Sequence, residues 1–166
     1  LPQSTYVNYF VNEVKKLSNM SVGGEIPNFS LPNPTGELVN LNEFKGKYVL
    51  LDIWATWCKP CVEEMPAFEK LAADYKAKGV AVVYVSMDFK SKHAKVVEFV
   101  AQKQLQNEVV LLNAPDYNAW IDKISPQWSG AIPATLVVKK TGNVLKFHEG
   151  SFTYDELVNF VKPLLK

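Results

Sequence analysis

The sequence has no arginine, almost no net charge and no long hydrophobic run. All 18 basic residues are lysines, and with 17 acidic residues they leave a formal net charge of +1. Arginine is the residue that most often binds phosphate and guanine with two hydrogen bonds, so we expect no nucleic-acid partner. The longest unbroken apolar stretch, Val80 to Val85, is far shorter than the roughly 20 residues of a membrane-spanning helix. No transmembrane segment is therefore predicted in this chain.

Cysteine is also scarce, and its placement is unusual. The two cysteines, Cys58 and Cys61, are separated by only two residues. A disulfide across so small a loop adds little stability, because the stabilisation grows with loop length. A structural zinc site needs four ligands, and the two histidines, His93 and His148, lie far apart and are expected at the surface. Haem attachment would need a histidine where Val62 stands. A structural zinc site is therefore disfavoured and no metal is predicted at this site, so the main choice is between an inert and a redox-active pair.

The length and composition are typical of one soluble globular domain. The chain has 166 residues, of which 48% are hydrophobic and 21% charged. Apolar residues at helical spacing predict an amphipathic helix at 5–17, so we divide the chain into an N-terminal extension, 1–21, and one domain, 22–166. Extended runs on both sides of a turn at 32–36 predict a β-hairpin. The later apolar runs predict an α/β fold with elements in the order β-α-β-α-β-β-α. Strands are expected at 48–55, 80–87, 109–112, 134–138 and 144–149. Helices are expected at 58–78, at 91–104 with Ser91 as N-cap, and at the C-terminus with Thr153 as N-cap.

The two cysteines lie where a buried strand is predicted to end and a helix to begin. The backbone N–H groups and the dipole of a helix N-terminus stabilise a thiolate at Cys58, and Lys59 adds a positive charge. Cys61 falls on the helix face that packs against the sheet, so it is expected to be the more buried thiol. Disulfide exchange requires this arrangement, because the first thiol attacks and the second resolves the mixed disulfide. We therefore favour the redox-active interpretation.

Two acidic residues accompany this motif. Asp52 interrupts an apolar strand, and a buried carboxylate is costly unless it is paired or protonated, which favours a functional role. Glu64 lies about 60° from Cys61 around the predicted helix, whereas Glu63 lies about 160° away. Only Glu64 can therefore border the active face, and for this residue a structural and a functional role are both open.

At this point the sequence resembles a known family. The run from Leu51 to Cys61, which includes Trp-Ala-Thr-Trp-Cys-Lys-Pro-Cys, resembles the active-site strand and turn of the thioredoxin superfamily. The segments from Gly24 to Phe29 and from Leu41 to Lys47 are similar to the TlpA/ResA-like thiol-disulfide oxidoreductases, which are grouped near the AhpC/TSA redoxins. The resemblance extends from Val22 to the C-terminus. It implies a thioredoxin-like fold, with a central mixed β-sheet flanked by helices, an N-terminal β-hairpin extension and a central strand-helix insertion.

The resemblance also implies roles for individual residues. Cys58 matches the nucleophile and Cys61 the resolving thiol. Pro133, in a run from Gly130 to Val138, matches a cis-proline that faces the dithiol and helps to hold the substrate backbone. Asp52 matches the buried acid that assists proton transfer at the second cysteine. Glu64 matches a glutamate that ResA-like proteins place near the dithiol.

Other residues are expected around the motif. Trp57 and Ile132 are predicted to form an apolar patch against which a partner protein docks, with Gly150 near the same groove. The two residues between the cysteines, Lys59 and Pro60, differ from the Gly-Pro usual in thioredoxins. A positive residue there favours the thiolate and tends to raise the reduction potential, which leaves the direction of electron flow open.

These observations predict an enzyme, a protein thiol-disulfide oxidoreductase whose only redox group is the Cys58–Cys61 pair, with no other cofactor. The resemblance implies protein thiol or disulfide substrates and an upstream redox partner, favours the reducing direction, and links the chain to cytochrome c biogenesis. The natural substrate, whether an apocytochrome, another oxidoreductase or a different protein, stays open. It also suggests a periplasmic or other extracytoplasmic location, with an N-terminal segment before Leu1 as signal or membrane anchor. Two alternatives stay open, namely a thiol peroxidase that forms a sulfenic acid at Cys58 and a dithiol module that binds copper or zinc.

Overall fold

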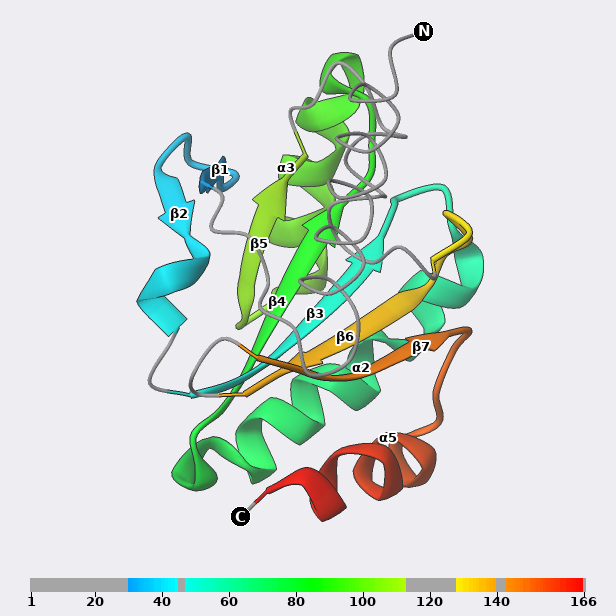
Figure 1. The fold of residues 1–166 in the computed structure, drawn as a ribbon. Helices are drawn as coiled ribbons and strands as arrows, with labels where there is room; N and C mark the ends of the chain where they lie inside the picture. The colour runs from blue at the N-terminus through cyan, green and yellow to red at the C-terminus, as the bar shows by residue number, and fades with distance from the viewer. Residues whose placement is uncertain (1–29, 45–46, 113–127, 140–142, 166) are drawn as a thin grey trace, which may run out of the picture.

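The computed structural model describes residues 30–44, 47–112, 128–139 and 143–165 of the chain (Figure 1). The predicted helix at 5–17 and the whole of the proposed extension, 1–21, lie outside these residues. Within the described part, no helix combines the length and the apolar character that crossing a bilayer requires.

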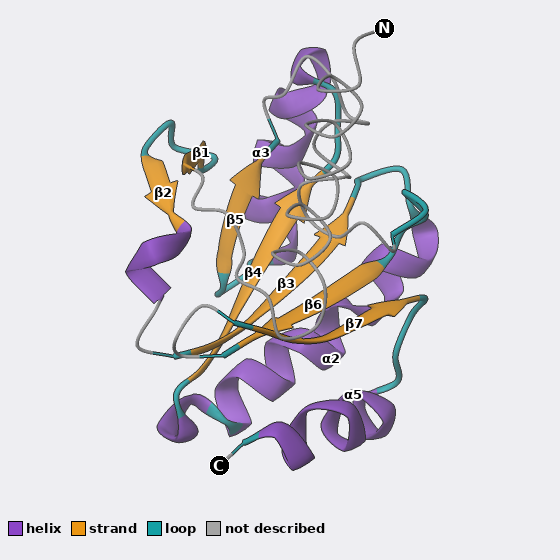
Figure 2. Cartoon of the chain, viewed as in Figure 1, coloured by secondary structure: helices purple, strands orange, loops and turns teal. Residues whose placement is uncertain are grey.

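A five-stranded mixed sheet forms the centre of the molecule, with strand order β5-β4-β3-β6-β7 (Figure 2). The central strand β3 (Tyr48–Trp54) runs parallel to β4 (Val80–Ser86), which runs parallel to β5 (Glu108–Leu111). On its other side β3 pairs antiparallel with β6 (Ala134–Val138), which pairs antiparallel with β7 (Val144–Glu149). Every residue of β3 and β6 is buried, which explains why both sequences are apolar apart from Asp52 and Thr135, because a strand covered on both faces needs no polar side.

Three helices cover one face of this sheet: α2 (Lys59–Asp74), α3 (His93–Lys103) and α5 (Tyr154–Val161). The predicted stripe on α2 is the buried one, since Cys61, Met65, Phe68 and Ala72 are all in the core. Short 3₁₀ turns extend several elements, at Leu41–Phe44, Lys76–Lys78, Lys90–Lys92 and Lys162–Leu164. The helix α3 and strand β5 follow β4, and they form the additional helix and strand expected in the middle of the chain.

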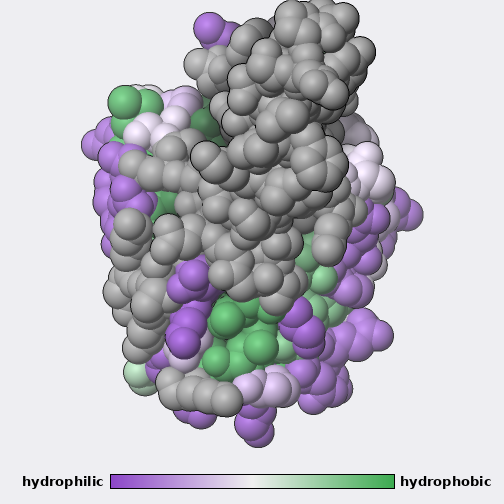
Figure 3. Space-filling model, in the orientation of Figure 1, coloured by the Kyte–Doolittle hydropathy of each residue, from purple (hydrophilic) through white to green (hydrophobic). Residues whose placement is uncertain are grey.

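The opposite face of the sheet packs against a β-hairpin and Trp128. The hairpin consists of β1 (Ser30–Pro32) and β2 (Leu38–Asn40), paired antiparallel. The Asn33 side chain closes its turn by accepting hydrogen bonds from the backbone N–H groups of Thr35 and Glu37, at 3.0 and 2.9 Å. In the view of Figure 3, the largest hydrophobic area lies near the lower centre with hydrophilic residues beside it, and smaller hydrophobic areas show at the upper left and on the right.

The predicted order of elements is confirmed for the described residues, and so is the thioredoxin-like architecture. Thr153 caps α5 in a capping box with Glu156, as its sequence predicts. The prediction of Ser91 as an N-cap is wrong. A 3₁₀ turn at Lys90–Lys92 precedes α3, so Ser91 lies inside this turn and the cap position falls to Lys92, whose side chain makes no capping hydrogen bond.

Candidate active site

Cys58 occupies the N-cap of α2, directly after the loop that leaves β3. Its backbone is extended, and its Sγ accepts a hydrogen bond from the Cys61 N–H with a donor-to-sulfur distance of 3.4 Å. The Pro60 in the first turn suits this place, because a proline there removes a backbone donor that would have no helical partner. The sulfur therefore lies at the positive end of a 16-residue helix, where a thiolate is stabilised.

The two sulfurs form a disulfide between Cys58 and Cys61. Cys61 is completely buried, whereas Cys58 retains 5% of its surface exposed. The expected order of exposure is therefore present, but in this oxidised form both residues are largely covered.

The side chains between and beside the cysteines point to solvent. Trp57 is 69% exposed, which is unusual for so large an apolar residue. The Lys59 side chain is 87% exposed, and its Nζ lies 3.8 Å from a carboxylate oxygen of Glu63. An exposed ion pair of this kind is weak, so the positive charge of Lys59 remains available to the solvent side of the motif.

Asp52 and Glu64 form a buried pair of carboxyl groups beneath the motif. They are 0% and 3% exposed, on β3 and α2 respectively. Glu64 Oε2 accepts a hydrogen bond of 2.8 Å from the Phe152 N–H. Among the described residues, its Oε1 and both oxygens of Asp52 have no hydrogen-bond partner. The helical geometry correctly separates Glu64 from Glu63, which is exposed.

The protonation of this pair is shifted strongly. Burial raises the pKa of Asp52 well above its usual value, and the nearby Glu64 charge raises it further. Burial also raises the pKa of Glu64, to about 7, although the hydrogen bond from Phe152 and the interaction with Asp52 act in the opposite direction. Two coupled carboxyl groups titrate as a pair, and this pair retains a proton near neutral pH.

The loop before β6 reaches the same edge of the sheet as Cys58. Ala134 pairs with Ile53, so Pro133 lies level with the end of β3, where the chain turns toward Cys58. The Ile132–Pro133 peptide bond is cis, which is rare enough that the sequence pattern alone would predict trans. Pro133 is buried and Ile132 is partly exposed.

Two hydrogen bonds hold this loop. The Gly150 N–H donates to the Pro133 carbonyl at 2.8 Å, and Gly150 has a φ of 113° that favours glycine. The Trp128 indole N–H donates to the Ala131 carbonyl at 2.7 Å. The structure therefore brings Gly150 to Pro133, and it gives the buried Trp128 a role in holding the loop beyond its place in the core.

A third buried acid, Asp88, is absent from the sequence-based predictions. It is 1% exposed and accepts two hydrogen bonds from Thr56, two residues before Cys58. A signal is present in the sequence, since Asp88 follows the apolar run of β4 just as Cys58 follows the run of β3. Parallel strands end at the same edge of a sheet, so an acid after one strand and a cysteine after its neighbour belong to one site.

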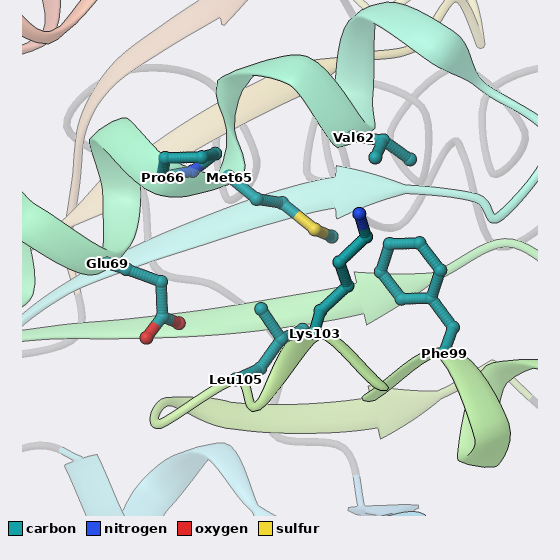
Figure 4. Close-up of a pocket in the computed structure, with 7 residues that line it drawn as sticks. All are labelled: Val62, Met65, Pro66, Glu69, Phe99, Lys103 and Leu105. Carbon is teal, nitrogen blue, oxygen red and sulfur yellow. The ribbon is translucent and has the colours of Figure 1, made fainter. Parts of the chain in front are cut away.

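Two of the hollows beside α2 lie near the motif or the buried acids. One of about 210 Å³ reaches Glu64 and is lined by Pro60, Glu63, Glu64, Ser151, Phe152, Thr153 and Glu156. The other, of about 320 Å³, lies between α2 and α3 and is lined by Val62, Met65, Pro66, Glu69, Phe99, Lys103 and Leu105 (Figure 4). The first gives solvent a route toward the buried carboxyl pair, and the second is mainly apolar and contains neither cysteine.

No group of three or more potential metal-ligating side chains occurs in the described part of the chain.

The prediction of two solvated surface histidines needs correction, because each is half-buried and has a partner. A ring nitrogen of His93 lies 3.2 Å from the Leu112 carbonyl oxygen, and the His148 ring stacks on Phe152 with a centroid distance of 4.2 Å. Packing against neighbouring elements, which the sequence around each histidine does not reveal, explains the difference.

Comparison with known proteins agrees with this geometry. The model of the AhpC/TSA family matches residues 22–147. The chain belongs to the AhpC/TSA family. It is 32% identical over 159 residues to the thiol-disulfide oxidoreductase ResA of Bacillus thuringiensis subsp. konkukian, covering 96% of this chain and 85% of ResA. It is 35% identical over 150 residues to the thioredoxin-like protein YneN of Bacillus subtilis, covering 90% of this chain and 84% of YneN.

Solved structures lead to the same fold. The thioredoxin domain of a thiol-disulfide oxidoreductase from Bacteroides vulgatus matches with a TM-score of 0.73 and 26% identity, over 88% of this chain and 99% of that domain. A thiol:disulfide interchange protein from Bacteroides sp. matches with a TM-score of 0.71 and 26% identity, over 89% and 91%. This AhpC/TSA chain is thus a thiol-disulfide oxidoreductase with a thioredoxin-like fold.

Proposed function

We propose that the chain exchanges disulfides with protein substrates through Cys58 and Cys61, without a further cofactor. The observation that supports this most strongly is the position of the pair. Cys58 caps α2 beside the exposed Trp57, and Cys61 is fully buried behind it. The exposed indole and the loop at Pro133 offer an apolar surface and a backbone edge to a polypeptide, which a small oxidant would not need.

In the reducing direction the reaction begins with the Cys58 thiolate. It attacks one sulfur of the substrate disulfide, forming a mixed disulfide and releasing the other substrate sulfur as a thiolate that takes a proton from water. Cys61 then loses its proton and attacks the Cys58 sulfur. This step forms the Cys58–Cys61 disulfide and releases the second substrate thiolate. The enzyme loses two electrons and the substrate gains them, so an upstream dithiol partner must reduce the enzyme again.

The buried carboxyl pair is suited to the proton transfer at Cys61. Glu64 is one helical turn after Cys61, and Asp52 lies on the strand beneath. A pair whose titration extends to about pH 7 can accept the Cys61 proton in one direction and return it in the other. The hollow that reaches Glu64 would connect this pair to bulk water.

Two single variants test this function with insulin as a protein disulfide. With dithiothreitol as the reductant, the Cys61→Ser variant should lose insulin turnover. When it is reduced first and freed of dithiothreitol before insulin is added, it should accumulate a mixed disulfide between Cys58 and an insulin chain, detectable by mass spectrometry. The Cys58→Ser variant is the matched control, and it should form no mixed disulfide. Peroxide consumption by an enzyme that never reacts with insulin would contradict the proposal, as would stoichiometric copper or zinc bound by both thiols.

We further propose an extracytoplasmic location, such as the periplasm, because protein disulfides persist mainly in oxidising compartments. A membrane anchor N-terminal to the domain would fit this location. Fractionation of cells that make the protein from its own gene tests it, and recovery of the oxidoreductase only with cytosolic markers would contradict it.

A further inference from the structure

Asp88 lies at the junction between the ends of β3 and β4. Its Oδ2 accepts hydrogen bonds from the Thr56 N–H at 2.9 Å and from the Ser86 hydroxyl at 2.8 Å. Its Oδ1 accepts one from the Thr56 hydroxyl at 2.5 Å. A buried carboxylate is costly to keep unless such donors surround it, so the arrangement has to be maintained by a specific set of hydrogen bonds.

Thr56 belongs to the turn that carries the nucleophile. Just before it, the Trp54 carbonyl accepts a hydrogen bond of 2.7 Å from the Met87 N–H. Just after it, the Cys58 N–H donates to the Ala55 carbonyl at 3.1 Å. The two bonds from Thr56 to Asp88 fix the middle of this turn from the side of β4, so the loop has little freedom to rotate.

The orientation of this turn decides where the Cys58 sulfur points. In the structure Sγ faces the Cys61 N–H at 3.4 Å, at the start of α2. A thiolate is stabilised there only while its sulfur stays within reach of the N–H groups of the first helical turn. A change of the turn that moves Sγ away would leave the thiolate to solvent.

We propose that Asp88 is a positioning residue for the reaction at Cys58, acting through Thr56 to hold the sulfur at the helix N-terminus. This inference rests on the proposed role of Cys58 as the nucleophile. Asp88 reaches Cys58 through hydrogen bonds to the turn, so its geometry matters more than its charge. The elements that adjoin the turn carry other ionisable groups, which the variants below leave unchanged: Asp52 on β3, Lys59, Glu63 and Glu64 at the start of α2, and Lys90 and Lys92 in the 3₁₀ turn after Asp88.

The test compares two variants of Asp88 in the full-length, fully reduced protein. The rate of Cys58 alkylation by iodoacetamide is measured against pH, with the modified site identified by mass spectrometry. Asp88→Ala removes the acceptors, and we expect the thiolate pKa to rise by about one unit, so that the rate near pH 6 falls about tenfold. Asp88→Asn should stay within about twofold of wild type, because its oxygen still accepts from backbone and hydroxyl donors and its amide can donate to the Thr56 hydroxyl.

Two further variants separate positioning from stability. Ser86→Ala removes two hydrogen bonds with Asp88 without touching Thr56, one from the Ser86 hydroxyl to Oδ2 and one from the Asp88 N–H to the Ser86 oxygen. It should therefore lower the urea midpoint and leave the alkylation profile unchanged. Thr56→Val removes only the hydroxyl bond and should give an intermediate shift, which keeps the test available if Asp88→Ala does not fold.

Other results would overturn the proposal. If both Asp88 variants lower the pKa of the Cys58 thiol relative to wild type, the charge of Asp88 acts directly on Cys58. If the Cys58 pKa is low in wild type and neither Asp88→Ala nor Thr56→Val changes it, the positioning role of Asp88 is refuted. The proposed function is then unaffected. If Cys58 in wild type has the pKa of a free thiol, this result counts against Cys58 as the nucleophile. The positioning role of Asp88, which rests on that assignment, is then refuted as well.

Discussion

Two buried carboxyl groups, those of Asp52 and Glu64, lie beneath the Cys58–Cys61 motif. Asp52 comes from the strand beneath the motif and Glu64 from the helix that begins with it, and both are buried. Burial raises the pKa of both groups, and the Glu64 charge raises that of Asp52 further, so the pair holds near neutral pH a proton that an exposed carboxyl group would lose near pH 4. A pair of this kind can store a proton beside Cys61 while both side chains stay buried in the fold.

Removal of one member of the pair tests this idea. In the Asp52→Asn variant we expect slower resolution of the mixed disulfide by Cys61, by about tenfold to a hundredfold, because general acid-base catalysis commonly contributes at least that much. The Cys58 thiolate pKa should change little, since Cys58 draws its stabilisation from the helix N-terminus. Single-turnover exchange with insulin across pH measures the first effect, and iodoacetamide alkylation measures the second. Unchanged exchange rates at every pH would remove Asp52 from the mechanism.

Sequence reasoning identified residues of the site where a local pattern exists. The helical angle between Cys61 and Glu64 separates a buried glutamate from its exposed neighbour, and this requires only the helix period. The contact between Asp88 and Thr56 spans 32 residues, so no local period can reveal it. The cis bond before Pro133 is likewise decided by the tertiary surroundings, and only the family resemblance indicated it.

Among the elements, α5 links the C-terminal end of the chain to the buried acids. Thr153 caps the helix through its side chain, while the Glu156 carboxylate accepts a hydrogen bond of 2.8 Å from the Thr153 N–H. The preceding residue, Phe152, donates its N–H to Glu64. The cap therefore fixes the start of α5 next to the residue that holds one carboxyl group of the pair.

Loss of this cap should destabilise the protein modestly. Thr153→Ala removes one side-chain acceptor, and the expected cost is about 1 kcal/mol of the free energy of unfolding. Thr153→Ser keeps the hydroxyl and serves as the matched control, with a cost within about 0.5 kcal/mol. Urea denaturation of the oxidised protein measures both. An equal loss in the two variants would show that the methyl group, and not the cap, stabilises this end of α5.

Elements differ in how well their sequences specify them. The strands β3, β4 and β6 follow from predominantly apolar runs, and the start of α5 follows from its capping box. The start of α3 does not follow in this way, because Ser91 is a good cap by residue type but a 3₁₀ turn moves the helix start to His93. Propensity thus places an element reliably, whereas the exact first turn depends on how the preceding loop packs.

For the whole molecule, the buried carboxyl pair makes stability depend on pH. The folded-state pKa of Glu64, about 7, exceeds its usual value of 4.5. The native state therefore holds this proton more tightly than the unfolded chain does. The resulting contribution to stability is fully present below about pH 4.5 and is lost as the pH rises toward 7. Asp52, whose pKa is also raised, contributes with the same sign.

The Glu64→Gln variant should flatten this part of the stability profile. Glutamine keeps an oxygen for the Phe152 N–H but cannot ionise. Between pH 4.5 and 7, the free energy of unfolding of wild type should therefore fall by up to about 3 kcal/mol relative to that of the variant. The exposed Glu63→Gln change, one residue earlier on α2, is the control and should keep the wild-type slope. Urea unfolding of the oxidised protein at several pH values gives the profiles without interference from thiol ionisation. Parallel profiles for wild type and Glu64→Gln would mean that Glu64 is ionised in the native state throughout this range, and that the proton stored beside Cys61 is held elsewhere.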